Sequence, residues 1–175
     1  MDASYSTSRR KFLGTSLRLI GLTALGGIPT SLFSSSLRQL TILHTNDTHS
    51  RIDPFPMNDP KYAGLGGVSR RAEIINRIRR ESENVLLLDS GDIFQGTPYF
   101  NLFGGEVEFK AMSAMKYDCA TFGNHDFDNG IEGLVSKLPY AEFPFVNSNY
   151  RLENTALHGK TEKFRIFEKS GIRVG

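Results

Sequence analysis

Three times along this chain of 175 residues, a short apolar or β-branched stretch runs directly into a cluster of acidic, amide or imidazole side chains. The apolar stretches are residues 40–45, 85–88 and 118–122, and the polar clusters that follow them begin at Asn46, Asp89 and Gly123. The second stretch is apolar at every position, which is expected of a strand that is buried on both faces of a sheet. This recurrence predicts a sheet in which each strand is followed by side chains that can bind a metal ion or transfer a proton.

Helical patterns separate these strands. Residues 68–83 place apolar side chains on one helical face and arginines elsewhere, which favours an amphipathic helix that covers a sheet and exposes a solvated basic face. Further helices are expected over residues 106–115 and 131–138, with a short strand at 143–147 and a strand pair at 163–167 and 172–174. Alternating strands and helices indicate an α/β layer fold with crossover helices.

The first 37 residues have the character of a leader. Arg9 and Arg10 precede a glycine-containing apolar stretch of roughly ten residues and then a Ser-rich segment, whereas a membrane span needs about twenty apolar residues. The pattern resembles a twin-arginine signal. We therefore expect residues 1–37 to be an export signal and linker, residues 38–175 to be the folded domain, and the protein to be periplasmic or at the cell surface, meeting the membrane only during export.

Composition excludes several classes of protein. Four of the 21 basic residues lie in the leader, so the remaining 17 are balanced by acids and provide no electrostatic surface for a nucleic-acid polymer. The single cysteine, Cys119, can form neither an internal disulfide nor a cysteine zinc cluster, and we interpret it as a small buried apolar residue. Any metal site must therefore consist of oxygen and imidazole ligands.

Such ligands follow the predicted strands. Because ligand sites in open α/β sheets lie beyond the carboxyl ends of the strands, we expect the polar clusters to converge. Asp47 and His49 are two residues apart, so in an extended segment their side chains would point the same way and hold one ion. Asp92 supplies a carboxylate that can bridge two cations, and Asn124 supplies a neutral carbonyl oxygen.

Mixed Asp, His and Asn ligation suits a divalent ion such as Mn, Zn, Fe or Co. Two such cations about 3.5–4 Å apart would hold a hydroxide nucleophile and neutralise phosphoryl oxygens during an in-line displacement. His125 would then stabilise or protonate the phosphoryl or leaving-group oxygen, with Asp128 orienting its ring and favouring its charged form. His44, inside the first strand, is interpreted as a partly buried structural residue.

Three motifs carry a resemblance to a known family. They are Asn46-Asp47-Thr48-His49, Gly91-Asp92-Ile93-Phe94-Gln95-Gly96-Thr97 and Gly123-Asn124-His125-Asp126-Phe127-Asp128-Asn129-Gly130. Together they resemble the signature blocks of the calcineurin-like metallophosphoesterases, and the third resembles the 5′-nucleotidase branch. The resemblance implies the N-terminal half of a four-layer α/β/β/α metallophosphoesterase sandwich and an exported hydrolase acting on a small-molecule nucleotide substrate.

The same resemblance implies roles for individual residues. Asp47 and His49 would bind the first of two divalent metal ions, and Asp92 would bridge both. Asn124 would bind the second ion, and His125 with Asp128 would form the catalytic dyad.

The chain also departs from the family pattern. The family completes its site with later histidines, including a G-H-x-H block, and adds a C-terminal nucleotide-binding domain, whereas the four histidines here are His44, His49, His125 and His158. We therefore expect the 175 residues to be the N-terminal part of a longer protein, incomplete at the C-terminus. The alternatives are an inactive truncated remnant with weak metal or nucleotide binding, and a hydrolase of cyclic phosphodiesters or sulfur esters on the same scaffold.

Overall fold

A three-stranded parallel sheet organises residues 38–175, the part of the chain that the computed structural model describes. Its strands are β1 (Thr41–Thr45), β2 (Val85–Asp89) and β3 (Cys119–Ala120), in the order β1-β2-β3. The register pairs Leu43 with Leu87 and Leu88 with Cys119. The export signal expected over residues 1–37 lies outside the described residues.

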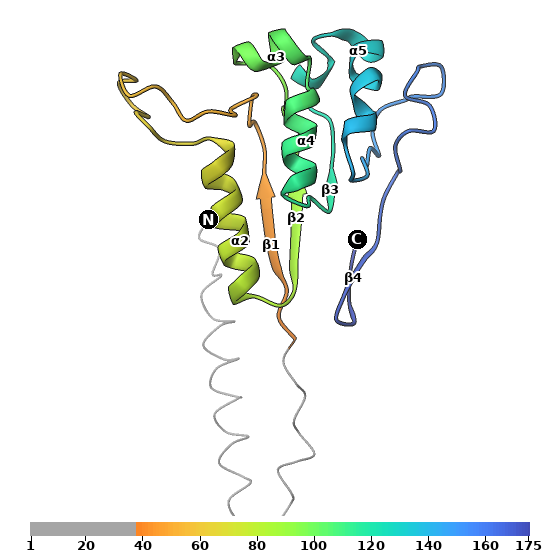
Figure 1. The fold of residues 1–175 in the computed structure, drawn as a ribbon. Coiled ribbons are helices and arrows are strands. Elements are labelled where there is room, and N and C mark those ends of the chain that lie inside the picture. Colours follow the sequence, from red (N-terminus) through yellow and green to blue (C-terminus); the bar gives the residue numbers. More distant parts are fainter. Residues whose placement is uncertain (1–37) are drawn as a thin grey trace, which may run out of the picture. The chain divides into compact units, whose positions relative to one another are not determined.

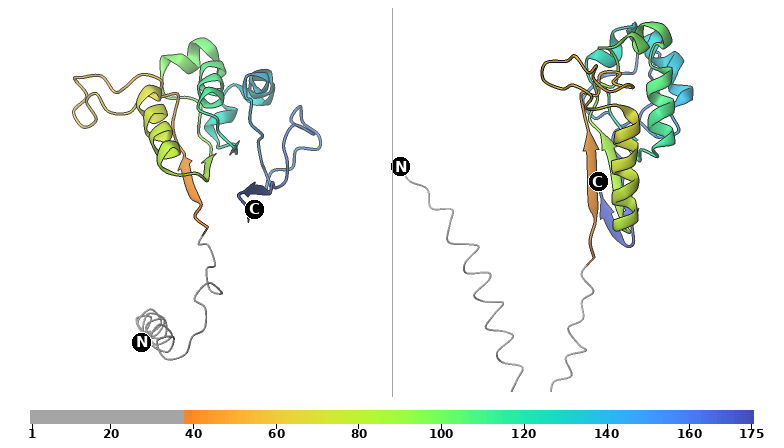
Figure 2. Two further views of the ribbon diagram at one scale, coloured as in Figure 1. Left: turned by 60° about the horizontal axis from the view of Figure 1, so that its bottom comes forward. Right: turned by 60° about the vertical axis from the view of Figure 1, so that its left-hand side comes forward.

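Helices form the connections between the parallel strands (Figure 1). The helical elements are α2 (Val68–Glu81) between β1 and β2, α3 (Pro98–Phe103) and α4 (Glu106–Ala114) between β2 and β3, and η2 (His125–Phe127), α5 (Gly130–Lys137) and η3 (Leu138–Tyr140) after β3. Figure 2 shows α2 and α4 on the same side of β1. This is the predicted α/β layer arrangement. Within residues 38–175, no helix combines the length and apolar character that a membrane span requires.

The two neighbouring strands β1 and β2 are buried to different extents. Leu86 and Leu87 on β2 are fully buried, which confirms the prediction for the apolar run. Strand β1 alternates instead: Leu43 packs against the core, while Ile42 and His44 are exposed. The expectation of a partly buried His44 was therefore wrong, because the residue lies on the open face of the first strand of the sheet.

Aromatic side chains fill much of the core beside the sheet. The Phe109 ring is fully buried, with centroids 4.8 Å from Phe94 and 5.3 Å from Phe145. Rings at these separations contribute about 0.5–1.5 kcal/mol per pair beyond the burial of their area. Cys119 is buried as expected. This packing fixes the base of the loops that follow β2 and β3.

Several boundaries differ from the sequence prediction. The third strand is only Cys119–Ala120, because the chain turns into a loop immediately after it. The segment expected as a strand at residues 143–147 forms only isolated parallel bridges, from Phe145 to Ala120 and from Val146 to Glu162. Helix α3 was not predicted, because its six residues are too few to display a helical period.

In the strand pair near the C-terminus, the first strand lies later than expected, and the second lies at residues 172–174 as predicted. The pair consists of β4 (Phe167–Lys169) and β5 (Ile172–Val174), paired antiparallel. Lys169 Nζ lies 2.9 Å from Asp118 Oδ1, and Ser170 Oγ donates to Asn84 Oδ1 at 2.7 Å. These contacts with distant residues anchor the hairpin, and they leave no trace in the local pattern of residues 163–174.

Arg79 was expected to lie on a solvated helix face, but its side chain forms hydrogen bonds within the protein. Its guanidinium donates to the carbonyl oxygens of Met115 at 2.6 Å and Lys116 at 2.7 Å, just past the end of α4. A cation in this position satisfies orphan carbonyls and complements the helix dipole. Arg79 therefore joins α2 to α4.

Candidate metal centre

The loop after β1 is a tight turn. Asp47, His49 and Ser50 have φ angles of 51°, 44° and 51°, so the segment is left-handed here and not extended as expected. The turn still places the first two side chains together, with His49 Nε2 3.8 Å from Asp47 Oδ1. Main-chain bonds hold it against the loop after β2: the amide of Asp47 donates to Gly91 O at 3.0 Å, and that of His49 to Asp92 O at 3.1 Å.

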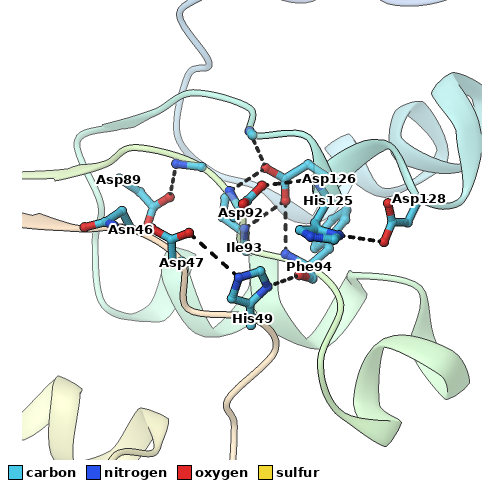
Figure 3. A network of polar contacts seen from close by, with 12 residues as sticks. Asn46, Asp47, His49, Asp89, Asp92, Ile93, Phe94, His125, Asp126 and Asp128 are labelled. Atoms are coloured by element: carbon cyan, nitrogen blue, oxygen red, sulfur yellow. Dashed lines mark hydrogen bonds and ion pairs between the residues drawn. The ribbon is translucent and has the colours of Figure 1, made fainter.

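Asp92 completes a cluster with these two residues. One ligand atom from each of Asp47, His49 and Asp92 lies within 4.8 Å of the others (Figure 3). His49 Nδ1 lies 3.2 Å from the carbonyl oxygen of Phe94, and a hydrogen bond donated there leaves the lone pair on Nε2, the nitrogen that lies 3.8 Å from Asp47 Oδ1. Two carboxylates and an oriented imidazole are a donor set that fits a divalent cation.

The loop after β3 joins the same edge of the sheet. The main-chain amide of His125 donates to Asp92 Oδ1 at 3.0 Å, and the His125 ring lies edge-on to that of His49 with centroids 5.2 Å apart. His125 Nδ1 is 2.9 Å from Asp128 Oδ2, a bond that raises the pKa of His125. Asn124, one residue before His125, is exposed and lies in this loop. All three predicted polar clusters therefore converge.

Two glycines allow the loops after β2 and β3 to touch. A Cβ on Gly123 would collide with the carboxylate and main-chain nitrogen of Asp92, and a Cβ on Gly91 would collide with the nitrogen of Gly123. Gly91 also has a φ of 93°, a conformation that side chains other than glycine rarely adopt. The close approach brings Asp92 against the third polar cluster.

Sequence reasoning missed the role of Asp126. This carboxylate is 1% exposed and accepts four main-chain N–H groups. Its Oδ1 accepts from Ile93 at 2.9 Å and Phe94 at 3.0 Å, while its Oδ2 accepts from Asp92 at 3.1 Å and Gly123 at 2.8 Å. Burial raises the pKa of Asp126, and the amide donors oppose that change. Asp126 is part of the third motif, but no local pattern distinguishes a buried carboxylate that accepts main-chain hydrogen bonds from an exposed carboxylate that binds a metal. We call this buried carboxylate with its four amide donors the Asp126 clamp.

A second buried carboxylate, Asp89, lies at the end of β2. It accepts hydrogen bonds from Thr45 Oγ1 at 2.5 Å and from the amide of Gly91 at 2.8 Å. Burial raises the pKa of Asp89 to about 6. The Thr45 hydroxyl also pairs with Tyr117 Oη at 2.8 Å, so this network supports the ends of β1 and β2 beneath the cluster.

The fold and the converging polar loops define a metallophosphoesterase. Residues 40–172 match the calcineurin-like phosphoesterase family, and the chain belongs to that family. Members of the family depend on divalent metal ions, and the cluster of Asp47, His49 and Asp92 is a candidate site for them.

Individual relatives place the chain near the 5′-nucleotidases. The snake venom 5′-nucleotidase of Crotalus adamanteus is 45% identical over 144 residues, covering 78% of this chain and 24% of that protein. A 5′-nucleotidase precursor from Thermus thermophilus and the NAD nucleotidase of Haemophilus influenzae both superpose with a TM-score of 0.69 and 34% identity. Each superposition covers 77% of this chain, and 27% and 25% of the respective solved chains.

These similarities confirm the predicted family and the mixed α/β metallophosphoesterase fold. They also confirm membership of a hydrolase family with 5′-nucleotidase relatives. The chain spans about a quarter of the length of the curated relatives that it matches.

Proposed function

We propose that this chain carries the metal-binding and proton-transferring residues of a phosphoesterase that releases phosphate from a small-molecule nucleotide. The observation that carries the proposal is the convergence of Asp47, His49 and Asp92 within 4.8 Å, beside the hydrogen-bonded pair of His125 and Asp128. The names of the relatives, which include 5′-nucleotidase, support a nucleotide as the substrate.

The proposed site would hold two divalent ions. Asp47 and His49 would be ligands of the first, Asp92 would be a ligand of both and Asn124 would be a ligand of the second. This ligand set suits Mn, Zn, Fe or Co. When bound, such ions supply Lewis-acid stabilisation of the phosphoryl oxygens and a nucleophile at neutral pH.

The protein's own residues orient the site and move the proton. The carbonyl of Phe94 fixes the His49 ring, and the amide of His125 fixes the Asp92 carboxylate. Because His125 Nδ1 bonds to Asp128, the proton available for transfer lies on Nε2. In the proposed reaction, His125 donates that proton to the oxygen of the leaving nucleoside, and Asp128 holds the ring in position.

The test is phosphate release from a nucleoside monophosphate by the whole protein that contains these residues, in the presence of Mn²⁺. We expect activity that disappears with a chelator, falls by about 10²–10⁴ in His125→Asn, and is lost in Asp92→Asn. His158→Asn is the matched control, because His158 is exposed and belongs to none of the three polar clusters. Activity that survives both the chelator and Asp92→Asn would contradict the proposed reaction, as would metal binding without any phosphate release.

We further propose that the protein is exported. The support is Arg9 and Arg10 ahead of an apolar stretch, together with a solved relative described as a 5′-nucleotidase precursor. Fractionation of cells that have a twin-arginine system should find the protein outside the cytoplasm. The variant with Arg9→Lys and Arg10→Lys should remain in the cytoplasm, and an equal distribution of both proteins would argue against this route.

A further inference from the structure

A hollow of about 620 Å³ opens beside the metal cluster. Asp47 and His49 line it on the side of the cluster, and Arg51 and Arg71 contribute two cationic side chains. Arg51 comes from the loop after β1, whereas Arg71 comes from the first turn of α2. Two segments separated in the sequence therefore bring guanidinium groups to one cavity.

Neither guanidinium has an anionic partner among the described residues, 38–175. Among residues 38–175, no carboxylate lies within 4.0 Å of Arg51 or Arg71, whereas Arg80 and Arg165 both form such ion pairs. Arg71 Nε is buried and makes no hydrogen bond. Burying a polar group of this kind costs free energy unless a ligand or solvent forms a hydrogen bond with it.

The Arg51 side chain is held in place by an aromatic ring. Its Cζ lies 4.0 Å from the centroid of Phe55, which also lines the hollow. Stacking of this type fixes the plane of a guanidinium while its N–H groups remain free to bind. The preorganised fork suits a tetrahedral oxyanion, which accepts two parallel N–H bonds.

Acidic groups near the hollow do not cancel this charge. Asp47 is the one acid among the residues that line the hollow, against the two guanidinium groups of Arg51 and Arg71, so the lining keeps a net positive charge even without bound metal. The nearby charge of Arg71 opposes the rise in the pKa of Asp89, but the carboxylate oxygens of Asp89 accept their hydrogen bonds from Thr45 and Gly91. The hollow therefore presents positive charge next to the place where phosphate esters are proposed to be cleaved.

We propose that Arg51 and Arg71 form a phosphate-binding subsite beside the metal centre. Its location rests on the proposed function, because the anion would be either the phosphate that the reaction releases or a second phosphate group of the substrate. Binding of the anion itself requires neither catalysis nor bound metal.

The subsite is tested by calorimetric titration of the full 175-residue chain, with excess chelator, using inorganic phosphate and methylenediphosphonate as probes. We expect saturable binding that weakens about tenfold or more in Arg51→Gln and in Arg71→Gln. Arg70→Gln is the matched control, because Arg70 is the exposed neighbour of Arg71 on α2 and does not line this hollow. Because Arg71 is partly buried, Arg71→Lys serves as a second variant that keeps the charge but removes the fork.

The two probes distinguish the sources of the anion. Tighter binding of methylenediphosphonate supports a second substrate phosphate, and equal binding supports the released phosphate. Unchanged affinities in both glutamine variants, or no saturable binding to the folded protein at millimolar concentrations, would overturn the subsite. Anion binding that persists in a chain without metal-dependent hydrolysis would refute only the proposed function.

Discussion

The main-chain amide of Asp92 donates a hydrogen bond of 3.1 Å to the carboxylate of Asp126. In the opposite direction, Asp92 Oδ1 accepts from the amide of His125 at 3.0 Å. The loops after β2 and β3 therefore exchange hydrogen bonds in both directions. This reciprocal arrangement fixes a proposed metal ligand through main-chain groups, which cannot change rotamer as side chains do.

Asp126→Ala should lower the free energy of unfolding by about 3–5 kcal/mol, because four main-chain N–H groups would lose their acceptor. Asp126→Asn should not restore stability, since its amide nitrogen would face two of these donors. Urea unfolding monitored by circular dichroism measures the effect. Asp128→Asn is the control, because Asp128 is exposed, and an equal loss in the two proteins would refute the clamp.

His49→Ala should weaken the binding of Mn²⁺ or Zn²⁺ at least about tenfold, because loss of a ligand costs no less than loss of its supporting hydrogen bond. Isothermal titration of the purified chain measures the affinity without any need for turnover. His158→Ala provides the control, since this histidine is exposed and far along the chain from the cluster. If the two variants bind metal equally well, His49 is not a ligand.

The sequence was sufficient for strands β1 and β2 and for the convergence of the polar clusters. The apolar residues of β2 predict a doubly buried strand, and parallel strands necessarily end at one edge of the sheet. For the same reason, the meeting of Asp47, His49 and Asp92 follows from where each residue stands after its strand.

Features that depend on contacts between residues far apart in the sequence could not be predicted in this way. The left-handed turn at Asp47 is held by Gly91 O, and the β4–β5 hairpin is anchored to Asp118 and Asn84. The clamp made by Asp126 is of the same kind, since three of its donors precede it by more than thirty residues. Local periodicity contains no information about such contacts.

Gly123→Ala should destabilise the protein by about 3 kcal/mol or more and weaken metal binding, because its Cβ would displace Asp92. Gly159→Ala is a useful comparison. It has a φ of 72° but no atom within 4 Å of an added Cβ, so it should cost only about 1 kcal/mol of backbone strain. Thermal unfolding of both variants measures the difference, and similar melting temperatures would contradict the close approach of the loops.

Asp89 should make the stability of the metal-free protein depend on pH. Burial raises its pKa from 3.8 to about 6, so the folded state binds this proton more tightly than the unfolded state does. The carboxyl therefore favours folding when protonated, and its contribution to stability is lost as the pH rises from about 4 to about 6. A shift of this size corresponds to a contribution on the order of 3 kcal/mol.

In Asp89→Asn this titration is absent, so the difference in free energy of unfolding between variant and wild type should move in favour of the variant across the same pH interval. Urea unfolding at several pH values from about 4 to about 7.5, with chelator present, measures that difference. Glu153→Gln, which alters an exposed acid, should give a nearly constant difference. A difference for Asp89→Asn that is equally constant would show that the Asp89 carboxyl has the same proton affinity in the folded and unfolded chains, and hence that its hydrogen bonds from Thr45 and Gly91 offset its burial.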